Sequence, residues 1–253
     1  MQAVILAGGL GTRLGPLTRK MPKPMVPVAG VPYLEHQLRL LARQSFRDVL
    51  LLTGYLGDQI EKYFAGGSSL GLRLRYSRET QPQGTGGALR DARRLLGESF
   101  LLLYGDSLLP IAYAAATRRL KDSAALGVIV VYRDPSGETA VRPNVALDRS
   151  GLVTRYDKAA ADPALEYVEA GVSCFRREVL DLLPGAGPAS FEQCVFPRLI
   201  DRRQLAALPT SQRFYDIGTP ERLQAIEEYL RAESEPSGQD VPSVPSPNER
   251  PSL

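Results

Sequence analysis

Short apolar runs alternate with amphipathic segments through the first half of the chain. The apolar runs have the length expected of buried strands, and they occupy residues 3–6, 48–53, 72–76, 100–104 and 127–132. The amphipathic segments carry apolar residues at helical spacing, and they occupy residues 33–43, 58–64, 87–96 and 111–121. This alternation predicts an α/β fold with a doubly wound, mostly parallel sheet, which binds ligands at the carboxyl ends of its strands.

After residue 132 the pattern changes to shorter strands separated by turns. The expected elements are strands at 144–147, 153–156 and 167–175, a helix at 191–200, a strand near 214–216 and a last helix at 220–232. Thr219 is the expected N-cap of that helix. We therefore predict one domain, 1–232, in which a small β region occupies part of 133–232. Residues 233–253 are rich in proline, serine and acid, which predicts a disordered tail.

The composition and charge limit which binding partners and which cellular locations are expected. A net charge of +3 is too small to favour nucleic acid, and 43% hydrophobic residues are ordinary for a globular protein. No apolar segment is long enough to span a membrane, and the start of the chain reads as a strand rather than a signal peptide. Two cysteines, without metal-ligand spacing or a disulfide framework, fit a reduced, cytoplasmic location. The sequence leaves a homo-oligomer open.

A glycine-rich loop follows the first predicted strand, with the sequence LAGGLGTRL at residues 6–14. Glycines let a backbone approach a ligand closely, and successive N–H groups can then face phosphate oxygens. The loop lacks the Gly-Lys pair of a Walker A motif, and Leu14 stands where a dinucleotide fingerprint needs its last glycine. Taken alone, the loop fits an anion site and an ordinary tight turn equally well.

A proline-braced segment, MPKPMVPV at residues 21–28, follows the loop. Pro24 favours an extended conformation at Lys23, because a residue that precedes proline avoids the helical region. A lysine on a stiff backbone loses little freedom when it meets a phosphate. Next to the glycine loop, Lys23 is therefore a candidate phosphate ligand.

The two segments together, GGxGTRL and PKPMVPV, closely resemble the sugar-phosphate nucleotidyltransferase family, and the likeness extends to about Tyr229. The resemblance implies a Rossmann-like, GT-A-like fold and transfer of a nucleoside monophosphate from an NTP to a sugar 1-phosphate, with Mg²⁺ as cofactor. It assigns Arg13 and Lys23 as catalytic residues. It also assigns the nucleotide to Leu6, Ala7, Gly8, Gly9, Gly11 and Thr12.

Further motifs extend the resemblance. The segment QPQGTGGAL, residues 81–89, looks like the family's base-reading loop, with Gln81 and the backbone near Gly86 in that role. The Gly105-Asp106 pair and the late DIGTPE segment, which contains Asp216, look like the family's two metal-binding positions. Each aspartate is also a suitable hard ligand for Mg²⁺.

The acceptor side departs from the family pattern. The resemblance assigns the sugar 1-phosphate to Asn144, Asp157, Lys158, Glu169 and Gly171. Glu169 replaces the usual asparagine, and Asn144 stands where many members have glycine. The overall run resembles bacterial enzymes that activate mannose- or heptose-type 1-phosphates with GTP. Uridylyl or thymidylyl transfer to a hexose 1-phosphate remains an alternative.

Two other classes of protein stay open. A GT-A glycosyltransferase would more often show D-x-D near residue 106, where this chain has GDSL. A non-catalytic nucleotide-sugar sensor would be expected to lack the phosphate-binding residues, yet Arg13, Lys23 and both aspartates are present. The transfer needs no histidine base, because a phosphate monoester loses its second proton at a pKa of about 6.

Overall fold

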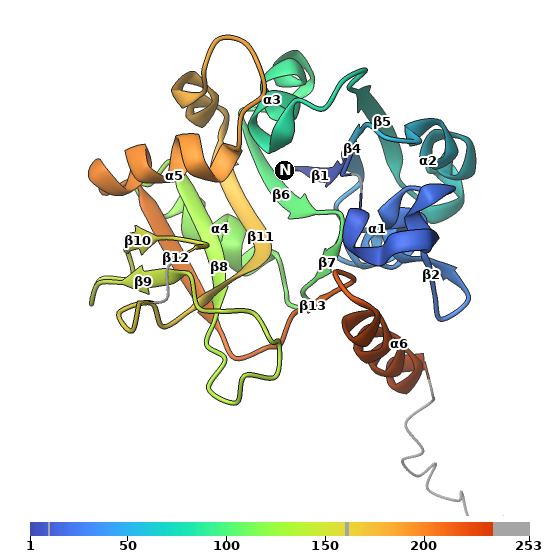
Figure 1. The fold of residues 1–253 in the computed structure, drawn as a ribbon. Coiled ribbons are helices and arrows are strands. Elements are labelled where there is room, and N and C mark those ends of the chain that lie inside the picture. The colour runs from blue at the N-terminus through green and yellow to red at the C-terminus, as the bar shows by residue number, and fades with distance from the viewer. Residues whose placement is uncertain (10, 160–161, 235–253) are drawn as a thin grey trace, which may run out of the picture.

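A seven-stranded, mostly parallel sheet forms the centre of the molecule in the computed structural model (Figure 1). The structure describes residues 1–9, 11–159 and 162–234, without the side chains of Thr12, Arg13 and Ser234. Only β11 runs antiparallel to its neighbours, β6 and β8. The strand order across the sheet is β12 (Leu205–Thr210), β8 (Gly127–Tyr132), β11 (Val168–Arg176), β6 (Ser99–Tyr104), β1 (Gln2–Ala7), β4 (Asp48–Thr53) and β5 (Arg73–Arg78).

Helices cover both faces of this sheet, so its central strands are apolar at almost every position. Alternate residues of β1 show the division, since Ala3 and Ile5 belong to one core and Val4 to the other. The first core includes residues of α1 (Tyr33–Arg43), α2 (Gly57–Phe64) and α4 (Ala114–Lys121). The second includes residues of α3 (Gly84–Asp91) and α5 (Phe191–Asp201).

Three two-stranded sheets and several short 3-10 helices complete the described chain. The small sheets pair β2 (Pro27–Val28) with β3 (Val31–Pro32), β7 (Ser107–Leu108) with β13 (Tyr215–Asp216), and β9 (Val145–Leu147) with β10 (Val153–Tyr156). The 3-10 helices are η1 (Thr12–Arg19), η2 (Lys23–Met25), η3 (Ser68–Leu70), η4 (Arg93–Leu95) and η5 (Arg177–Leu182).

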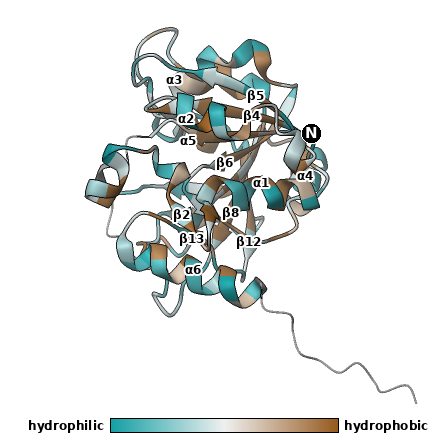
Figure 2. Cartoon of the chain, turned by 90° about the vertical axis from the view of Figure 1, so that its right-hand side faces the viewer, coloured by the Kyte–Doolittle hydropathy of each residue, from teal (hydrophilic) through white to brown (hydrophobic). Residues whose placement is uncertain are grey.

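The last helix, α6 (Pro220–Ser234), lies beside β13 and β2 (Figure 2). Ile226 belongs to a third apolar cluster together with Tyr33 and Ile217. Tyr229 stacks on Tyr215 with ring centroids 4.5 Å apart. The helix is therefore packed against the strand that carries Asp216.

The α/β class, with a mostly parallel sheet, is confirmed, but several local expectations are wrong. The strand β12 was not expected, although it extends the main sheet in parallel with β8. The helix expected at 87–96 begins earlier, at Gly84, and ends at Asp91. The helix expected at 111–121 begins at Ala114.

The conformation at Lys23 is a further correction. Lys23 begins a 3-10 turn instead of lying extended, and the extended residue is Pro22. Hydrogen bonds from Met25 N to Pro22 O (2.8 Å) and from Val26 N to Lys23 O (3.2 Å) close this turn. These bonds offset the preference of a residue before proline for extended backbone.

Two expectations about the ends of elements can be compared with the described residues. The last helix continues through residues 233 and 234, which had been assigned to the tail, and residues 235–253 of that prediction lie outside the described part. Within the described ranges, no helix has both the length and the apolar character that crossing a bilayer requires.

Candidate active site

A pocket of about 900 Å³ opens at the carboxyl ends of four adjacent strands, β6, β1, β4 and β5. The chain leaves β1 and then builds β4 and β5 on one side and β6 on the other, so the pocket lies at a topological switch point. Its lining includes Leu6, Ala7, Gly8, Gly9, Lys23, Leu52, Tyr55, Glu79, Gln81, Thr85, Tyr104 and Asp106.

Close backbone approach explains two of the glycines at this edge. A Cβ at Gly8 would lie 3.1 Å from Glu79 Oε1 and 3.3 Å from Gly54 N. A Cβ at Gly105 would lie 2.6 Å from Leu6 O, the same carbonyl that accepts a 2.9 Å hydrogen bond from Gly105 N. The loops after β1, β4 and β6 are thus drawn together in a way that larger residues would prevent.

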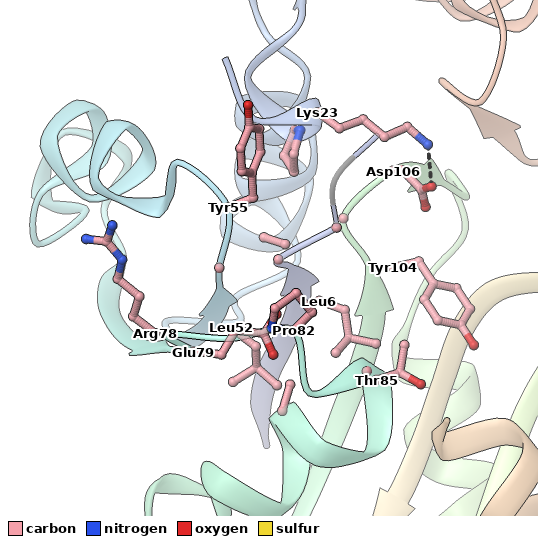
Figure 3. A pocket seen from close by; sticks show the side chains of 18 of the residues that line it. Leu6, Lys23, Leu52, Tyr55, Arg78, Glu79, Pro82, Thr85, Tyr104 and Asp106 are labelled. Carbon is pink, nitrogen blue, oxygen red and sulfur yellow. Dashed lines mark hydrogen bonds and ion pairs between the residues drawn. The ribbon is translucent and has the colours of Figure 1, made fainter. Parts of the chain in front are cut away.

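Lys23 lies between the glycine loop and the end of β6. Its Nζ is 2.6 Å from Asp106 Oδ2, and Lys23 as a whole is only 7% exposed. Gly11 adopts a left-handed φ of +65°, and a Cβ there would lie 2.9 Å from Lys23 Cβ. Figure 3 shows Lys23 and Asp106 together at one side of the pocket. The side chains of Thr12 and Arg13, which were assigned to the triphosphate, lie outside what the structure describes.

The two aspartates assigned to the metal lie at one pair of strands, since Asp216 belongs to β13 and Asp106 directly precedes β7. Asp216 of β13 is opposite Ser107 of β7, the residue next to Asp106. Ile217 N also donates a 3.1 Å hydrogen bond to Asp106 O. Burial is the largest cause that raises the pKa of the Tyr33 hydroxyl, and the carboxylates of Asp106 and Asp216 raise it further. Segments far apart in the sequence therefore bring both acids to the same edge of the site.

The donor set suits a hard divalent cation that also takes phosphate oxygens. Asp106 and Asp216 supply carboxylate oxygens, which Mg²⁺ prefers. Among the described residues, no group of three or more acidic, histidine or cysteine side chains is arranged to hold a metal ion by itself. Mg²⁺ usually keeps several waters and binds through one or two carboxylates together with substrate phosphates. Two aspartates therefore fit a cation that is shared with a nucleotide.

The other end of the pocket is formed by the residues that follow β5 (Figure 3). Gln81 lines the pocket and is exposed. Gly86 is buried and does not line the pocket, and its N–H donates a 2.8 Å hydrogen bond to Ala189 O. Glu79, which sequence reasoning did not select, lines the pocket and accepts a 2.9 Å hydrogen bond from Gln83 N. Burial raises the pKa of its carboxyl above the usual 4.5.

The residues assigned to the sugar 1-phosphate lie close together, near Tyr104. Asn144 Oδ1 accepts a 2.9 Å hydrogen bond from Glu169 N, and Asn144 O accepts another from Asp157 N at 2.9 Å. A Cβ at Gly171, where φ is +77°, would lie 2.8 Å from Ser107 Cβ. Lys158 Nζ is 3.8 Å from Glu169 Oε2. The structure thus brings together all five residues of this group.

A second carboxylate, Glu192 of α5, joins this group. It accepts hydrogen bonds from Tyr104 and from Thr85 (3.0 Å), two residues that line the pocket. Glu169 accepts a 2.8 Å hydrogen bond from Tyr156. Burial raises the pKa of Glu169, with Lys158 opposing it. Burial also raises the pKa of Glu192, but Lys158 and hydrogen bonds, among them those from Tyr104 and Ser190, outweigh burial and hold that pKa below 4.5.

Sequence reasoning missed Glu79, Tyr104, Tyr156 and Glu192. A signal existed for the first two, because Glu79 directly follows β5 and Tyr104 ends β6, at the edge where ligands bind. No local signal pointed to Tyr156 or Glu192, since only the packing of β10 and α5 brings them to Tyr104 and Glu169.

Comparison with known proteins gives consistent matches. Residues 2–233 match the family model described as nucleotidyl transferase. The mannose-1-phosphate guanylyltransferase of Mycobacterium tuberculosis is 33% identical over 224 residues, 87% of this chain and 62% of that protein. The UTP–glucose-1-phosphate uridylyltransferase of Synechocystis is 29% identical over 249 residues, 92% of this chain and 64% of that protein. This chain therefore spans less than two thirds of the length of either relative.

A solved structure has the same fold. The UDP-glucose pyrophosphorylase from Acinetobacter baumanii superposes with a TM-score of 0.80 at 20% identity, covering 92% of this chain and 94% of the other. The likeness therefore extends over nearly the whole described chain.

Proposed function

The chain belongs to the nucleotidyl transferase family, and from this premise we propose that it transfers a nucleoside monophosphate from an NTP to a sugar 1-phosphate, releasing pyrophosphate. Residues of 1–132 bind the nucleotide, and residues of 133–232 bind the acceptor. The observation that carries the proposal is the meeting of Lys23, Asp106 and the β13 strand of Asp216 beside a pocket at the carboxyl edge of the sheet.

The nucleophile is a phosphate oxygen of the sugar 1-phosphate, which is already ionised at neutral pH because its second pKa is about 6. It attacks the α-phosphorus, and the bond to the β-phosphate oxygen breaks. No protein base is needed. The barrier comes from the approach of two anions, so the work of the chain is to position both and to stabilise their charge.

Lys23 and Arg13 are the proposed cations of the triphosphate site. Lys23 exchanges its carboxylate partner for phosphate oxygens, and the N–H groups of the loop containing Gly9 and Gly11 face the same anion. Asp106 and Asp216 would hold Mg²⁺, which supplies charge neutralisation at the phosphates when it is bound. The pyrophosphate leaves from the side of the glycine loop.

The finer proposal is guanylyl transfer, and Glu79 supports it. The hydrogen-bonding edge of guanine carries two adjacent donors, N1–H and the 2-amino group, which an ionised carboxylate can accept together. Uracil and thymine offer one N–H between two carbonyl groups, and a carboxylate repels those carbonyls. The guanylyltransferase relative at 33% identity points to the same base.

The proposed acceptor is a mannose- or heptose-type 1-phosphate. Lys158, beside Glu169, is the proposed phosphate ligand on this side, and Asp157, Asn144 and Gly171 shape the sugar pocket. The Synechocystis relative supports an alternative, transfer of a uridylyl group to a hexose 1-phosphate.

The test is a pyrophosphate-release screen of purified protein with GTP, UTP, dTTP, ATP and CTP, each combined with mannose, heptose and glucose 1-phosphates. We expect release with GTP and a mannose- or heptose-type acceptor, in the presence of Mg²⁺. Release only with UTP or dTTP would contradict guanylyl transfer and favour the uridylyl or thymidylyl alternative. No release with any pair would contradict the proposed reaction.

A further inference from the structure

Both proposed metal ligands already have a cationic partner in the chain. Asp106 pairs with Lys23 at 2.6 Å, and Asp216 pairs with Arg222 of α6 at 3.0 Å. The two acids thus do not form an uncompensated negative pair. An incoming divalent cation must compete with two protein charges, one for each carboxylate.

The partner of Asp216 is held firmly. Arg222 Nη1 contacts both oxygens of Asp216, at 3.3 and 3.0 Å, and its Nη2 donates a 2.9 Å hydrogen bond to Ala140 O. The side chain of Asp216 is 13% exposed and that of Arg222 is 25% exposed. Gly218 N donates a further 2.6 Å hydrogen bond to Asp216 Oδ1. One guanidinium therefore connects α6, Asp216 and the loop between β8 and β9.

The partner of Asp106 is placed differently. Lys23 lines the pocket, and its ammonium group is a single point charge on a flexible stem. A triphosphate in the pocket offers Lys23 a stronger anionic partner than one carboxylate. Arg222 is absent from the pocket lining, so a nucleotide can draw Lys23 away from Asp106 while Arg222 stays on Asp216.

We propose that Arg222 is a positioning residue that holds the Asp216 carboxylate and makes divalent-cation binding depend on the nucleotide. Without nucleotide, the charges of Lys23 and Arg222 oppose a cation between the two aspartates. With nucleotide, Lys23 moves to the phosphates, and phosphate oxygens add the missing negative charge. The inference rests on the proposed function, because it takes Asp106 and Asp216 as the metal ligands.

The charge of Arg222 sets the expected size of the effect. A unit charge about 6 Å from a divalent cation costs roughly 1.4 kcal/mol of repulsion even at the dielectric constant of water, which corresponds to about tenfold in affinity. Replacing Arg222 by a neutral residue should therefore tighten cation binding to the nucleotide-free protein by about this factor or more. A residue with a merely structural role would not tighten it.

The experiment measures protein-bound Mn²⁺ by the loss of the free-ion EPR signal, with and without GTP and with no sugar 1-phosphate. Each titration with GTP is compared with the same concentrations of Mn²⁺ and GTP without protein, because GTP itself binds Mn²⁺. The variants are Arg222→Gln, which removes the charge, and Arg222→Lys, which keeps it. Arg231→Gln is the matched control, because Arg231 lies on the same helix, 70% exposed, and pairs with Glu227. Melting temperatures of all four proteins establish that each is folded.

Arg222→Gln should bind Mn²⁺ alone about tenfold more tightly than the wild type, whereas Arg222→Lys and Arg231→Gln should match the wild type. Equal or weaker binding by a folded Arg222→Gln would overturn the inference. The wild type gives an independent measurement, since Mn²⁺ affinity that is the same with and without GTP would also overturn it. No protein-bound Mn²⁺ in any protein, even with GTP, would instead refute the proposed metal site itself.

Discussion

At the scale of single residues, Lys23 lies in tightly packed surroundings. It is buried against Gly11, it contacts Asp106, and its own backbone forms a tight turn. A buried ammonium that is paired with one carboxylate in the free chain is well placed to meet a more highly charged anion. The residue is therefore preorganised, and its removal would leave Asp106 without its cationic partner.

Lys23→Ala should lower kcat/KM by about 10²–10³, because removal of one preorganised charge contact typically costs about 2.7–4 kcal/mol. Arg13→Ala should cause a loss of the same order. The measurement is initial-rate pyrophosphate release. Lys20→Ala is the control, since Lys20 is exposed and does not line the pocket. A Lys23→Ala enzyme with unchanged kcat/KM would remove Lys23 from the triphosphate site.

Glu79→Gln should reduce the preference for GTP over UTP by about 1–3 kcal/mol, the usual value of a good bidentate contact to a base. The wild-type preference should also depend on pH. Burial raises the pKa of Glu79, so the carboxyl is protonated below that pKa and can no longer accept both guanine donors. The GTP/UTP ratio of kcat/KM should therefore rise as the pH increases through this raised pKa, which lies above the usual 4.5.

Comparison of the two nucleotides cancels the titration of the phosphates, which both share. The same ratio measured for Glu79→Gln should be flat across the pH range, because glutamine does not titrate. A wild-type ratio that falls with rising pH would assign the base contact to another group.

At the scale of elements, the start of α3 depends on the segment that leads into α5. Gly84 has φ of +70°, and a Cβ there would lie 2.5 Å from Ala189 O. Gly86 N and Gly87 N both donate to that carbonyl. Thr85, between these glycines, contacts Glu192. The glycine turn thus joins the pocket at the carboxyl edge of the sheet to the helix that carries Glu192, a buried acid of the proposed acceptor region.

Gly84→Ala should lower the free energy of unfolding by about 2–5 kcal/mol, the sum of left-handed backbone strain and overpacking. Gly187→Ala separates backbone strain from overpacking, since Gly187 has φ of +78° but a Cβ added there would meet open space. It should cost only about 1–2 kcal/mol. Urea denaturation measures both. Equal losses for the two variants would show that contact with Ala189 contributes nothing.

At the scale of the whole molecule, the site lies between two groups of elements. Strands β1, β4 and β5 lead into the loops that carry the glycines and Glu79, while β10, β11 and α5 carry or lead into most of the proposed acceptor residues. Tyr104, at the end of β6, and Asp106, just after it, contact both groups. A ligand that touches both groups stabilises the folded chain as a whole, because it binds only when they are assembled.

GTP with Mg²⁺ at about 100 times its Kd should stabilise the protein by about 2.7 kcal/mol. For a chain of this length, that raises Tm by roughly 5–10 °C, at about 2–4 °C per kcal/mol. A thermal shift assay measures it. GTP with EDTA should give a smaller shift, and so should Lys23→Ala with GTP and Mg²⁺. Identical shifts with and without the metal would contradict a nucleotide site that shares a cation.

Periodicity and local motifs were sufficient for the α/β class and for most strands of the sheet. Strand β1 could be predicted because a buried parallel strand is a continuous apolar run. The glycine loop could be predicted because a positive φ and the close approach of two backbone segments both favour glycine. Asp106 could also be predicted, since an acid two residues after the end of β6 lies at the carboxyl edge of the sheet. Each of these signals comes from neighbouring residues in the sequence, so the sequence alone is enough to detect it.

Tertiary structure alone decided which distant residues meet. The pairing of β7 with β13 places Asp216 beside Asp106, and the packing of α6 gives Asp216 its arginine partner. Glu192 reaches Tyr104 only because α5 packs against α3. Such contacts depend on how helices and strands fill a shared core, and no short stretch of sequence encodes that arrangement. Lys23 shows the same limit locally, because hydrogen bonds in its turn outweighed the backbone preference that proline sets.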